Sequence, residues 1–217
     1  MQLKENGQKS LKKNKINKKF VYLISPNKIK GNKFYIDLEQ ALNSKKVSFF
    51  QLRLKNETSR NKISIGKKIK KICKKHRVKF LVNDEPYLAK KLKADGCHIG
   101  QKDMSILKVK KILKKKIIGI TCHNSINLVK QAIKSQPNYI ALGAFYSSKT
   151  KKVKFKANIQ ILKYVKTMTK IPIVAIGGIK SNNYKKLLLN KANFLAISGY
   201  IWNNKKLKPI EAINKLK

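Results

Sequence analysis

The sequence predicts an α/β protein with a single domain, a (β/α)8 TIM barrel. Eight short apolar runs alternate along the chain with amphipathic, lysine-rich stretches, and this alternation predicts a parallel sheet with helices outside it. The count of eight favours a closed barrel over an open doubly wound sheet. The 217 residues suit one such barrel, whose usual size begins near ~200 residues, and no Pro/Ser/Gly-rich linker divides the pattern.

Most of the predicted strands are continuous apolar runs, as expected of parallel strands that are covered on both faces. They lie at residues 21–25, 49–54, 79–84, 96–100, 117–122, 139–145, 171–178 and 194–198. Helices are predicted between the strands and after the last one, at 35–43, 58–76, 86–93, 104–114, 125–135, 158–169, 181–190 and 209–216. Pro86 is placed to open its helix, and Ser125 and Ser181 are placed to cap theirs.

The chain is strongly basic, with a formal net charge of +44. Of its 53 basic residues only Arg53, Arg60 and Arg77 are arginines, whereas a nucleic-acid binder is expected to use more arginine for phosphates and base edges. Scattered lysines therefore indicate a compositional bias, and we expect no specific nucleic-acid partner. Residues 1–19 are polar and lysine-rich without apolar periodicity, which predicts a disordered basic tail before a barrel domain at 20–217.

The sequence shows no signal for a membrane or for secretion. No stretch approaches the ~18 apolar residues that a membrane span needs, and the first residues lack the apolar region of a secretory signal. Cys73, Cys97 and Cys122 are far apart and form no CxxC pair, which argues against a disulfide framework or a zinc site. We therefore expect a cytoplasmic protein with no membrane partner.

The second predicted strand ends in a polar segment. In such barrels the working residues follow the carboxyl ends of the strands, and alternation puts Gln51, Arg53 and Lys55 on one face. Two cations and an amide that point the same way predict a site for an anion of pyrophosphate size. The alternative is a solvated charge pair, which is disfavoured because arginine is rare here and Arg53 lies inside an apolar run.

Acidic residues are scarce, yet four of the nine in the chain lie within about twenty residues. Two of them, Asp84 and Asp103, follow neighbouring strands, where a pair of carboxylates predicts a Mg²⁺ site that substrate phosphates and water would complete. These acids could instead offset local lysines or cap helices. The cations Arg53 and Lys55 on the adjacent strand favour the metal.

The three histidines lead to different expectations. His123 follows the fifth strand and could carry a proton or donate a hydrogen bond to a substrate, although a lone histidine is more often structural. His98 has apolar alternate neighbours, which predicts a hydrogen-bonded histidine of the core or the rim. His76 lies in a run of lysines and is expected to be solvated.

The last three strands end in loops that suit phosphate binding. Hydroxyls and cations alternate in residues 143–152, as in a mobile lid, although an ordinary polar loop is the alternative. Gly177 and Gly178 after the seventh strand, and Gly199 after the eighth, let backbone N–H groups approach a phosphate at the usual phosphate site of a barrel. Trp202 lies either in the core or at the mouth.

Together these segments resemble the thiamine phosphate synthase family. The matching motifs are FQLRLK (50–55), LVND (81–84), ADGCHIGQKD (94–103), GITCH (119–123), GAFYSSKTKK (143–152) and AIGGI (175–179), and the resemblance spans about residues 20–203. It implies an Mg²⁺-dependent transferase that condenses 4-amino-2-methyl-5-hydroxymethylpyrimidine diphosphate with 4-methyl-5-(2-phosphoethyl)thiazole. The products would be thiamine phosphate and pyrophosphate.

The resemblance also implies a role for each matching residue. The pyrimidine diphosphate would be held by Gln51, Arg53 and Lys55, its pyrimidine by Asn83, and its Mg²⁺ by Asp84 and Asp103. Thr121 would lie near the diphosphate, His123 would contact substrate, and Lys151 would reach the leaving group. The thiazole phosphate would be bound by Ser148, Thr150, Gly178, Ile197 and Ser198.

Two departures from the family pattern concern the thiazole end. The segment Tyr-Ser-Ser-Lys-Thr-Lys lacks a proline that the family usually has after its aromatic residue, and Gly199-Tyr200 replaces smaller residues. A related barrel, the thiazole tautomerase, uses a histidine after strand five and no metal; His123 fits that role, but the pair Asp84 and Asp103 argues against it. A basic nucleic-acid-binding barrel is a further alternative, and a homo-oligomer is possible.

Overall fold

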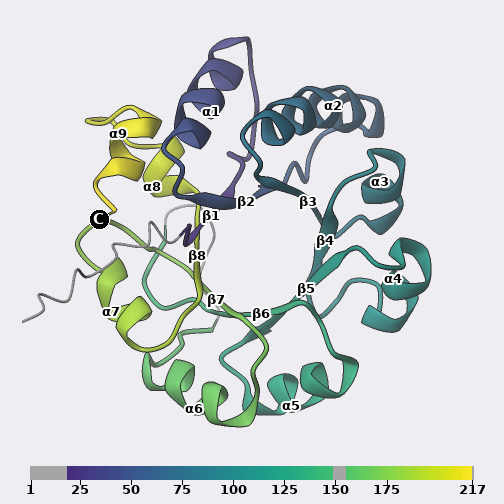
Figure 1. Ribbon diagram of the computed structural model, residues 1–217, viewed down its shortest axis with the longest axis vertical. Coiled ribbons are helices and arrows are strands. Elements are labelled where there is room, and N and C mark those ends of the chain that lie inside the picture. The colour runs from purple at the N-terminus through teal and green to yellow at the C-terminus, as the bar shows by residue number, and fades with distance from the viewer. Residues whose placement is uncertain (1–18, 149–154, 217) are drawn as a thin grey trace, which may run out of the picture.

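The fold is a closed barrel of eight parallel strands in the order β1 to β8, and each strand pairs with its neighbours in the sequence. The computed structural model describes residues 19–148 and 155–216, so the predicted tail at 1–19 falls outside the described residues except for Lys19. Figure 1 looks into the ring of strands, with the helices arranged around its outside. The predicted (β/α)8 barrel is confirmed.

The strands and helices alternate as expected. The strands are β1 (Val21–Ile24), β2 (Val47–Leu52), β3 (Lys79–Asn83), β4 (Gly96–Ile99), β5 (Ile117–His123), β6 (Tyr139–Gly143), β7 (Ile173–Ile176) and β8 (Phe194–Ile197). The helices are α1 (Lys33–Asn43), α2 (Ser59–Lys75), α3 (Pro86–Lys91), α4 (Ile106–Leu113), α5 (Ile126–Ser135), α6 (Gln160–Met168), α7 (Tyr184–Leu189), α8 (Gly199–Trp202) and α9 (Pro209–Asn214).

The ends of the elements differ from the predicted ends where side chains or glycines intervene. Pro86 opens α3 and Ser125 caps α5 by accepting a hydrogen bond from the Leu128 N–H, as predicted. Ser181 does not cap α7, which begins after Asn183. The seventh strand ends at Ile176, two residues earlier than expected, because positive φ angles at Gly177 and Gly178 turn the chain away from the sheet.

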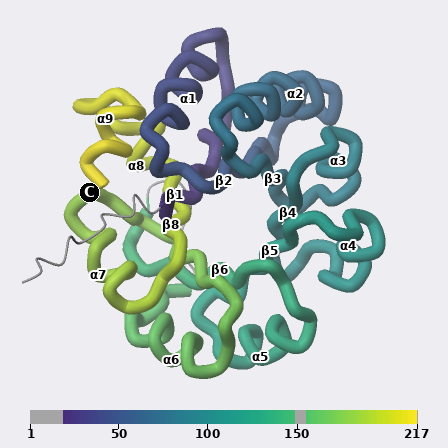
Figure 2. Tube along the Cα trace, in the orientation of Figure 1, coloured from purple at the N-terminus to yellow at the C-terminus, as the bar shows by residue number. Residues whose placement is uncertain are grey.

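The barrel closes where β1 pairs with both β2 and β8. The tube in Figure 2 shows the short helix α8, which the sequence did not predict, following β8 beside this seam. Its Trp202 donates a hydrogen bond from Nε1 to the Ile24 carbonyl at 2.7 Å, and its ring packs 5.2 Å from that of Phe34. Trp202 therefore packs at the seam between the first and last strands.

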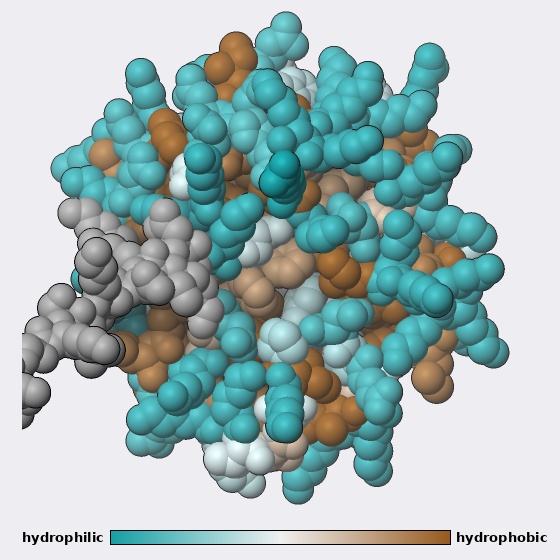
Figure 3. All heavy atoms as spheres, in the orientation of Figure 1, coloured by the Kyte–Doolittle hydropathy of each residue, from teal (hydrophilic) through white to brown (hydrophobic). Residues whose placement is uncertain are grey.

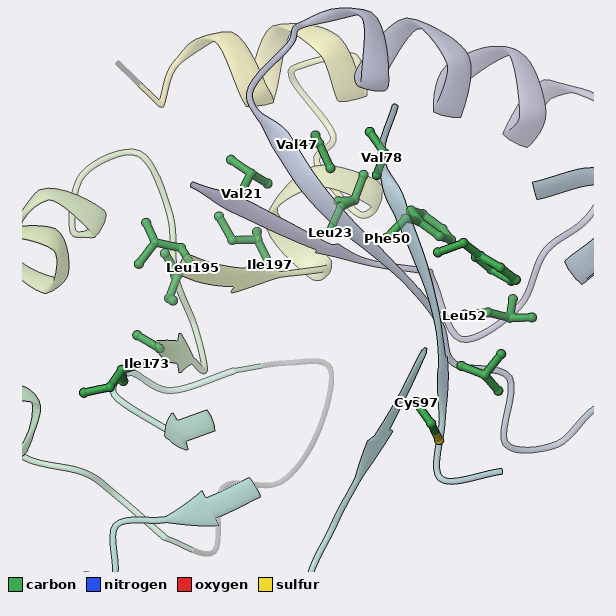
Figure 4. Close-up of a cluster of buried hydrophobic side chains, with 14 of the residues drawn as sticks. Val21, Leu23, Val47, Phe50, Leu52, Val78, Cys97, Ile173, Leu195 and Ile197 are labelled. Atoms are coloured by element: carbon green, nitrogen blue, oxygen red, sulfur yellow. The ribbon is translucent and has the colours of Figure 1, made fainter. Parts of the chain in front are cut away.

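The core has two parts, one on each face of the sheet. Residues such as Leu23, Phe50 and Ile197 point outward and pack under the helices, as Figure 4 shows. The barrel interior is filled by a second cluster of buried residues: Tyr22, Ile24, Leu81, Tyr139, Ala141, Val174 and Ala196. With both faces buried, continuous apolar strands form in place of alternating ones.

Lysines cover the outside of the barrel. Figure 3 shows hydrophilic side chains on all sides of the visible face, with apolar ones between them and near the centre. In the part of the chain that the structure describes, no helix is long and apolar enough to cross a membrane. Cys73, Cys97 and Cys122 are all buried and free.

Candidate active site at the carboxyl ends of the strands

The end of β2 is fixed by hydrogen bonds to the segment after β1. The Arg53 N–H donates to the hydroxyl of Ser25 at 2.9 Å, and Nη1 of Arg53 donates to Oδ1 of Asn27 at 3.1 Å. Ser25 is buried, with an exposed fraction of 2%, and its carbonyl also accepts a bond from the Ser198 hydroxyl at 3.1 Å. Gln51 is buried as well, at the level of Leu81 on β3. Ser25 thus links the ends of three strands beside the guanidinium.

Two carboxylates meet at the ends of β3 and β4. Asp84 follows β3 with a left-handed φ of 63°, and its N–H donates to the His98 carbonyl at 2.7 Å. Asp103 curls back so that Oδ2 accepts from the Gly100 N–H at 2.7 Å. Burial raises the pKa of Asp84, and the nearby carboxyl of Asp103 raises that pKa further.

A lysine completes this group. Nζ of Lys55 lies 3.4 Å from Oδ2 of Asp84, whose side chain is 23% exposed, and this cation opposes the rise of the Asp84 pKa. The three side chains come from the loops after three successive strands, as the shared direction of parallel strands requires. Two carboxylates that lie this close together favour a bound cation.

The two carboxylates suit Mg²⁺, but they are too few to bind a metal ion through protein ligands alone. Among residues 19–148 and 155–216, no group of three or more histidine, cysteine, aspartate or glutamate side chains could hold a metal. Mg²⁺ commonly uses one or two carboxylates together with substrate phosphates and waters. Asp84 and Asp103 match that pattern, provided that a phosphate supplies further oxygens.

Thr121 on β5 is held by two neighbours. Its Oγ1 is hydrogen-bonded to Nε2 of His98 at 2.8 Å, and its carbonyl accepts a bond from the side-chain amide of Gln101. Asn83 pairs with His98 in the strand register, so the Asn83 side chain belongs to the same end of the barrel. His98 is therefore hydrogen-bonded within the barrel, as predicted for a core or rim histidine.

The other two histidines lie outside this group. His123, at the end of β5, has a φ of 52°, and its ring centre lies 4.5 Å from that of Phe155. His76 was expected to be solvated, and this is wrong: its side chain is 14% exposed and its Nε2 lies 3.6 Å from Oε1 of Glu39. His76 follows the last turn of α2, which packs against α1, and this contact removes its ring from water.

The loop after β6 is pinned at both of its described flanks. The Ala144 N–H donates to the Phe155 carbonyl at 2.9 Å, and the Ala157 N–H donates to the Ala144 carbonyl at 2.8 Å. Ser148 is half-buried on the first flank. Thr150 and Lys151, predicted to bind thiazole phosphate and the leaving group, lie outside the described residues.

The glycines after β7 lie directly against this loop. Gly178 has a φ of +60°, and a Cβ there would lie 2.2 Å from the Ser147 carbonyl oxygen. The Tyr146 N–H donates to the Gly177 carbonyl at 3.1 Å, and Asn183 donates from Nδ2 to the Gly178 carbonyl. Close backbone contact therefore requires glycine at this position.

The end of β8 lies at the seam, where Ile197 pairs with Leu23 of β1. Ile197 is buried, and the Ser198 hydroxyl is used to bind the Ser25 carbonyl. The backbone of these two residues leads directly into α8, whose N-cap is Ser198. Ser25, Asn27 and Asn183 were missed from the sequence, because short polar residues in loops give no signal beyond a turn preference.

Comparison with known proteins identifies the family of this chain. A model of the family described as "Thiamine monophosphate synthase" matches residues 21–201. A thiamine-phosphate synthase of Pelagibacter ubique is 71% identical over 207 residues, which cover 95% of this chain and 100% of that protein. One from Erythrobacter litoralis is 37% identical, with 88% of this chain and 92% of that protein covered.

A solved structure supports the same assignment. The thiamine phosphate pyrophosphorylase of Pyrococcus furiosus superposes with a TM-score of 0.80 at 26% identity, and the match covers 92% of this chain and 94% of that one. The family resemblance expected from the six motifs is confirmed. This chain belongs to the thiamine monophosphate synthase family.

Proposed function

We propose that this chain is a thiamine phosphate synthase. It joins 4-amino-2-methyl-5-hydroxymethylpyrimidine diphosphate to 4-methyl-5-(2-phosphoethyl)thiazole and releases pyrophosphate. The names of its relatives support this activity. The structural observation that carries it is the cluster of Lys55, Asp84 and Asp103, in which a carboxylate pair lies beside a cation at adjacent strand ends.

The reaction requires the enzyme to stabilise a leaving group. The bond between the pyrimidine methylene carbon and the diphosphate oxygen breaks, and its electron pair leaves with pyrophosphate. The thiazole nitrogen then donates its lone pair to the methylene carbon, so no protein nucleophile is needed. The protein has to neutralise the leaving charge and hold the thiazole in line.

Asp84 and Asp103 would hold Mg²⁺ on the diphosphate. When bound, this ion supplies positive charge that offsets the charge developing on the leaving oxygens. Arg53, whose guanidinium is oriented by Asn27, would bind the diphosphate through a fork of N–H donors, and Lys55 would add a point charge.

The remaining substrate contacts follow the family resemblance. Gln51 would help Arg53 and Lys55 to hold the pyrimidine diphosphate, Asn83 would contact its pyrimidine, and Thr121 would lie near the diphosphate. Lys151 would reach the leaving group, and His123 would contact substrate. The thiazole phosphate would bind at the β6–β8 side of the mouth, to Ser148, Thr150, Gly178, Ile197 and Ser198.

The two other candidate functions have less support. A metal-free tautomerase has no use for the Asp84–Asp103 pair, in which burial and then the neighbouring Asp103 carboxyl raise the pKa of Asp84. A dedicated nucleic-acid surface would gather cations on one side, whereas exposed lysines lie on every helix from α1 to α7 around the ring. We place the activity in the cytoplasm, where free cysteines such as Cys73 stay reduced.

An assay of the purified protein separates these functions. We expect pyrophosphate release only when both substrates and Mg²⁺ are present, together with thiamine phosphate in equal amount. Isomerisation of a thiazole phosphate without metal would indicate the tautomerase. Absence of both reactions, with tight binding to a duplex oligonucleotide at physiological salt, would indicate the nucleic-acid function.

A further inference from the structure

A chain of hydrogen bonds crosses the barrel interior. The hydroxyls of Tyr22 and Tyr139 lie 2.7 Å apart, the Tyr139 hydroxyl lies 2.9 Å from Nδ1 of His98, and Nε2 of His98 lies 2.8 Å from Oγ1 of Thr121. These four side chains come from β1, β6, β4 and β5. Tyr22 and Tyr139 are each only 2% exposed. Polar atoms inside an otherwise apolar barrel need a reason, because burying them is costly.

The donors and acceptors allow two continuous arrangements of this chain, in each of which all three hydrogen bonds point in the same direction. Both ring nitrogens of His98 are hydrogen-bonded to hydroxyls and not to a carboxylate, so at neutral pH, above the ordinary imidazole pKa of about 6.5, the ring is neutral and has one N–H. Three hydroxyl protons and one ring proton give four donors for three hydrogen bonds. One donor, at one end of the chain or the other, is therefore left over.

The two ends differ in their surroundings. If the protons point toward Tyr22, its hydroxyl proton is left over in the apolar interior, where the Tyr22 ring lies 5.3 Å from that of Phe49. Tyr139 is the only hydrogen-bond partner of that hydroxyl among the described residues. An unsatisfied buried donor carries the full desolvation penalty. If the protons point toward Thr121, the left-over proton lies at the carboxyl end of β5, where the Thr121 side chain is only partly buried.

We propose that Tyr22, Tyr139 and His98 are positioning residues, which fix Thr121 as a hydrogen-bond donor toward the mouth of the barrel. Tyr22 donates to Tyr139, Tyr139 donates to Nδ1 of His98, and the Nε2–H of His98 donates to Oγ1 of Thr121. With its acceptor side occupied, the Thr121 hydroxyl presents its proton to a ligand. The ligand is a phosphate oxygen of the pyrimidine diphosphate, and only this last identity rests on the proposed function.

The tautomer of His98 tests the direction without substrate. The chain contains three histidines, so nitrogen-15 spectra that correlate ring nitrogens with ring protons can be assigned by replacing His76 and His123 one at a time with Gln. We expect His98 in the Nε2–H form at neutral pH, with an added Nδ1–H population in Tyr139→Phe. An Nδ1–H form in the wild-type protein would reverse the chain and overturn the proposal.

Two matched variants test the consequence for turnover. The amide of Gln reaches the place of Nε2, whereas the shorter Asn reaches only that of Nδ1. We expect His98→Asn to lower kcat about tenfold or more, with a smaller change in the KM for the diphosphate, and His98→Gln to recover most of that loss. Equal losses in two variants that retain the wild-type circular dichroism spectrum would assign His98 a purely structural role and contradict the proposal.

The two tests fail independently. If the wild-type protein makes no thiamine phosphate, the proposed function is wrong, while the tautomer of His98 still decides the direction of the chain. If the wild-type protein is active but Thr121→Val keeps its kcat, the proposed function stands and the inference about Thr121 is overturned. We expect Thr121→Val to lose at least as much kcat as His98→Asn, because it removes the donor itself.

Discussion

The carboxyl groups of Asp84 and Asp103 lie within hydrogen-bonding reach of each other, although they follow different strands of the barrel. Two carboxylates in contact repel, and a protein that keeps them together commonly does so for a cation. Lys55 offsets part of this repulsion at 3.4 Å from Asp84. The negative charge that Lys55 leaves uncompensated would bind a Mg²⁺ ion, and this ion would in turn bind a diphosphate.

Loss of the Arg53 guanidinium is expected to remove most of the activity. We expect Arg53→Ala to lower kcat/KM by about 10²-fold or more while the fold stays intact, since a charge-stabilising donor at the leaving group is lost. Arg60→Ala, at an exposed arginine in the first turn of α2, is the matched control and should keep wild-type kinetics. Full activity in Arg53→Ala would remove Arg53 from the diphosphate site.

Ser25 is expected to matter for stability more than other serines. In Ser25→Ala the half-buried Arg53 N–H loses its acceptor, and we expect the free energy of unfolding to fall by about 1–3 kcal/mol. Ser48→Ala removes an exposed hydrogen bond to the Lys19 carbonyl and should change the free energy of unfolding by less than about 0.5 kcal/mol. Urea unfolding of both variants measures the difference, and equal values would refute the role assigned to Ser25.

Gly178 and Gly31 separate backbone strain from close contact. Both have a φ near +60°, but a Cβ at Gly31 meets no atom within 4 Å, whereas one at Gly178 meets the Ser147 carbonyl oxygen. We expect Gly31→Ala to cost about 1–2 kcal/mol and Gly178→Ala clearly more. Gly178→Ala should also raise the KM for the thiazole phosphate. Thermal unfolding together with steady-state kinetics checks both effects; similar costs at the two sites would argue against the tight contact.

The stability of the protein should depend on pH through His98. Its pKa in the folded state, about 4, lies below the ordinary value of 6.5, so between these values the unfolded chain binds a proton that the folded chain does not. Stability should therefore fall as the pH drops through this window and be fully present above pH 6.5. We expect a loss of about 1–2 kcal/mol between pH 7 and pH 5.

Replacement of the titrating ring provides the control for this prediction. Between pH 7 and pH 5 the free energy of unfolding of His98→Gln should fall by about 1–2 kcal/mol less than that of the wild-type protein. The variant lacks the titrating ring, whereas the carboxylates titrate alike in both proteins. Urea unfolding at the two pH values measures it. An identical pH dependence in the two proteins would show that the His98 pKa is not lowered by folding.

Much of the fold followed from the sequence, because buried parallel strands have a pattern that few other structures share. Arg53, Asp84 and Asp103 stood out because arginine and acids are rare in this chain and these three follow apolar runs. Tyr139 and Tyr22 did not, since an aromatic residue within an apolar strand looks like core until its hydroxyl partner is known. Pairing across strands is a tertiary property, and one sequence does not show it.

Local details failed for related reasons. Ser181 has the residue type of a helix cap, but the positive φ angles at the preceding glycines redirect the chain, and α7 begins three residues later than expected. His76 lies among lysines and still packs beside α1, because a helix end can be covered by its neighbour. Neither the start of α7 nor the packing of His76 can be read from the spacing of nearby residues.

The central claim is that Asp84 and Asp103 bind a diphosphate through Mg²⁺. Titration calorimetry of the purified protein with inorganic pyrophosphate, with and without Mg²⁺, tests it most directly. The account predicts binding that is strengthened at least about tenfold by Mg²⁺ in the wild-type protein, and no such strengthening in Asp103→Ala. Pyrophosphate binding that is independent of Mg²⁺, or unchanged by Asp103→Ala, would contradict it.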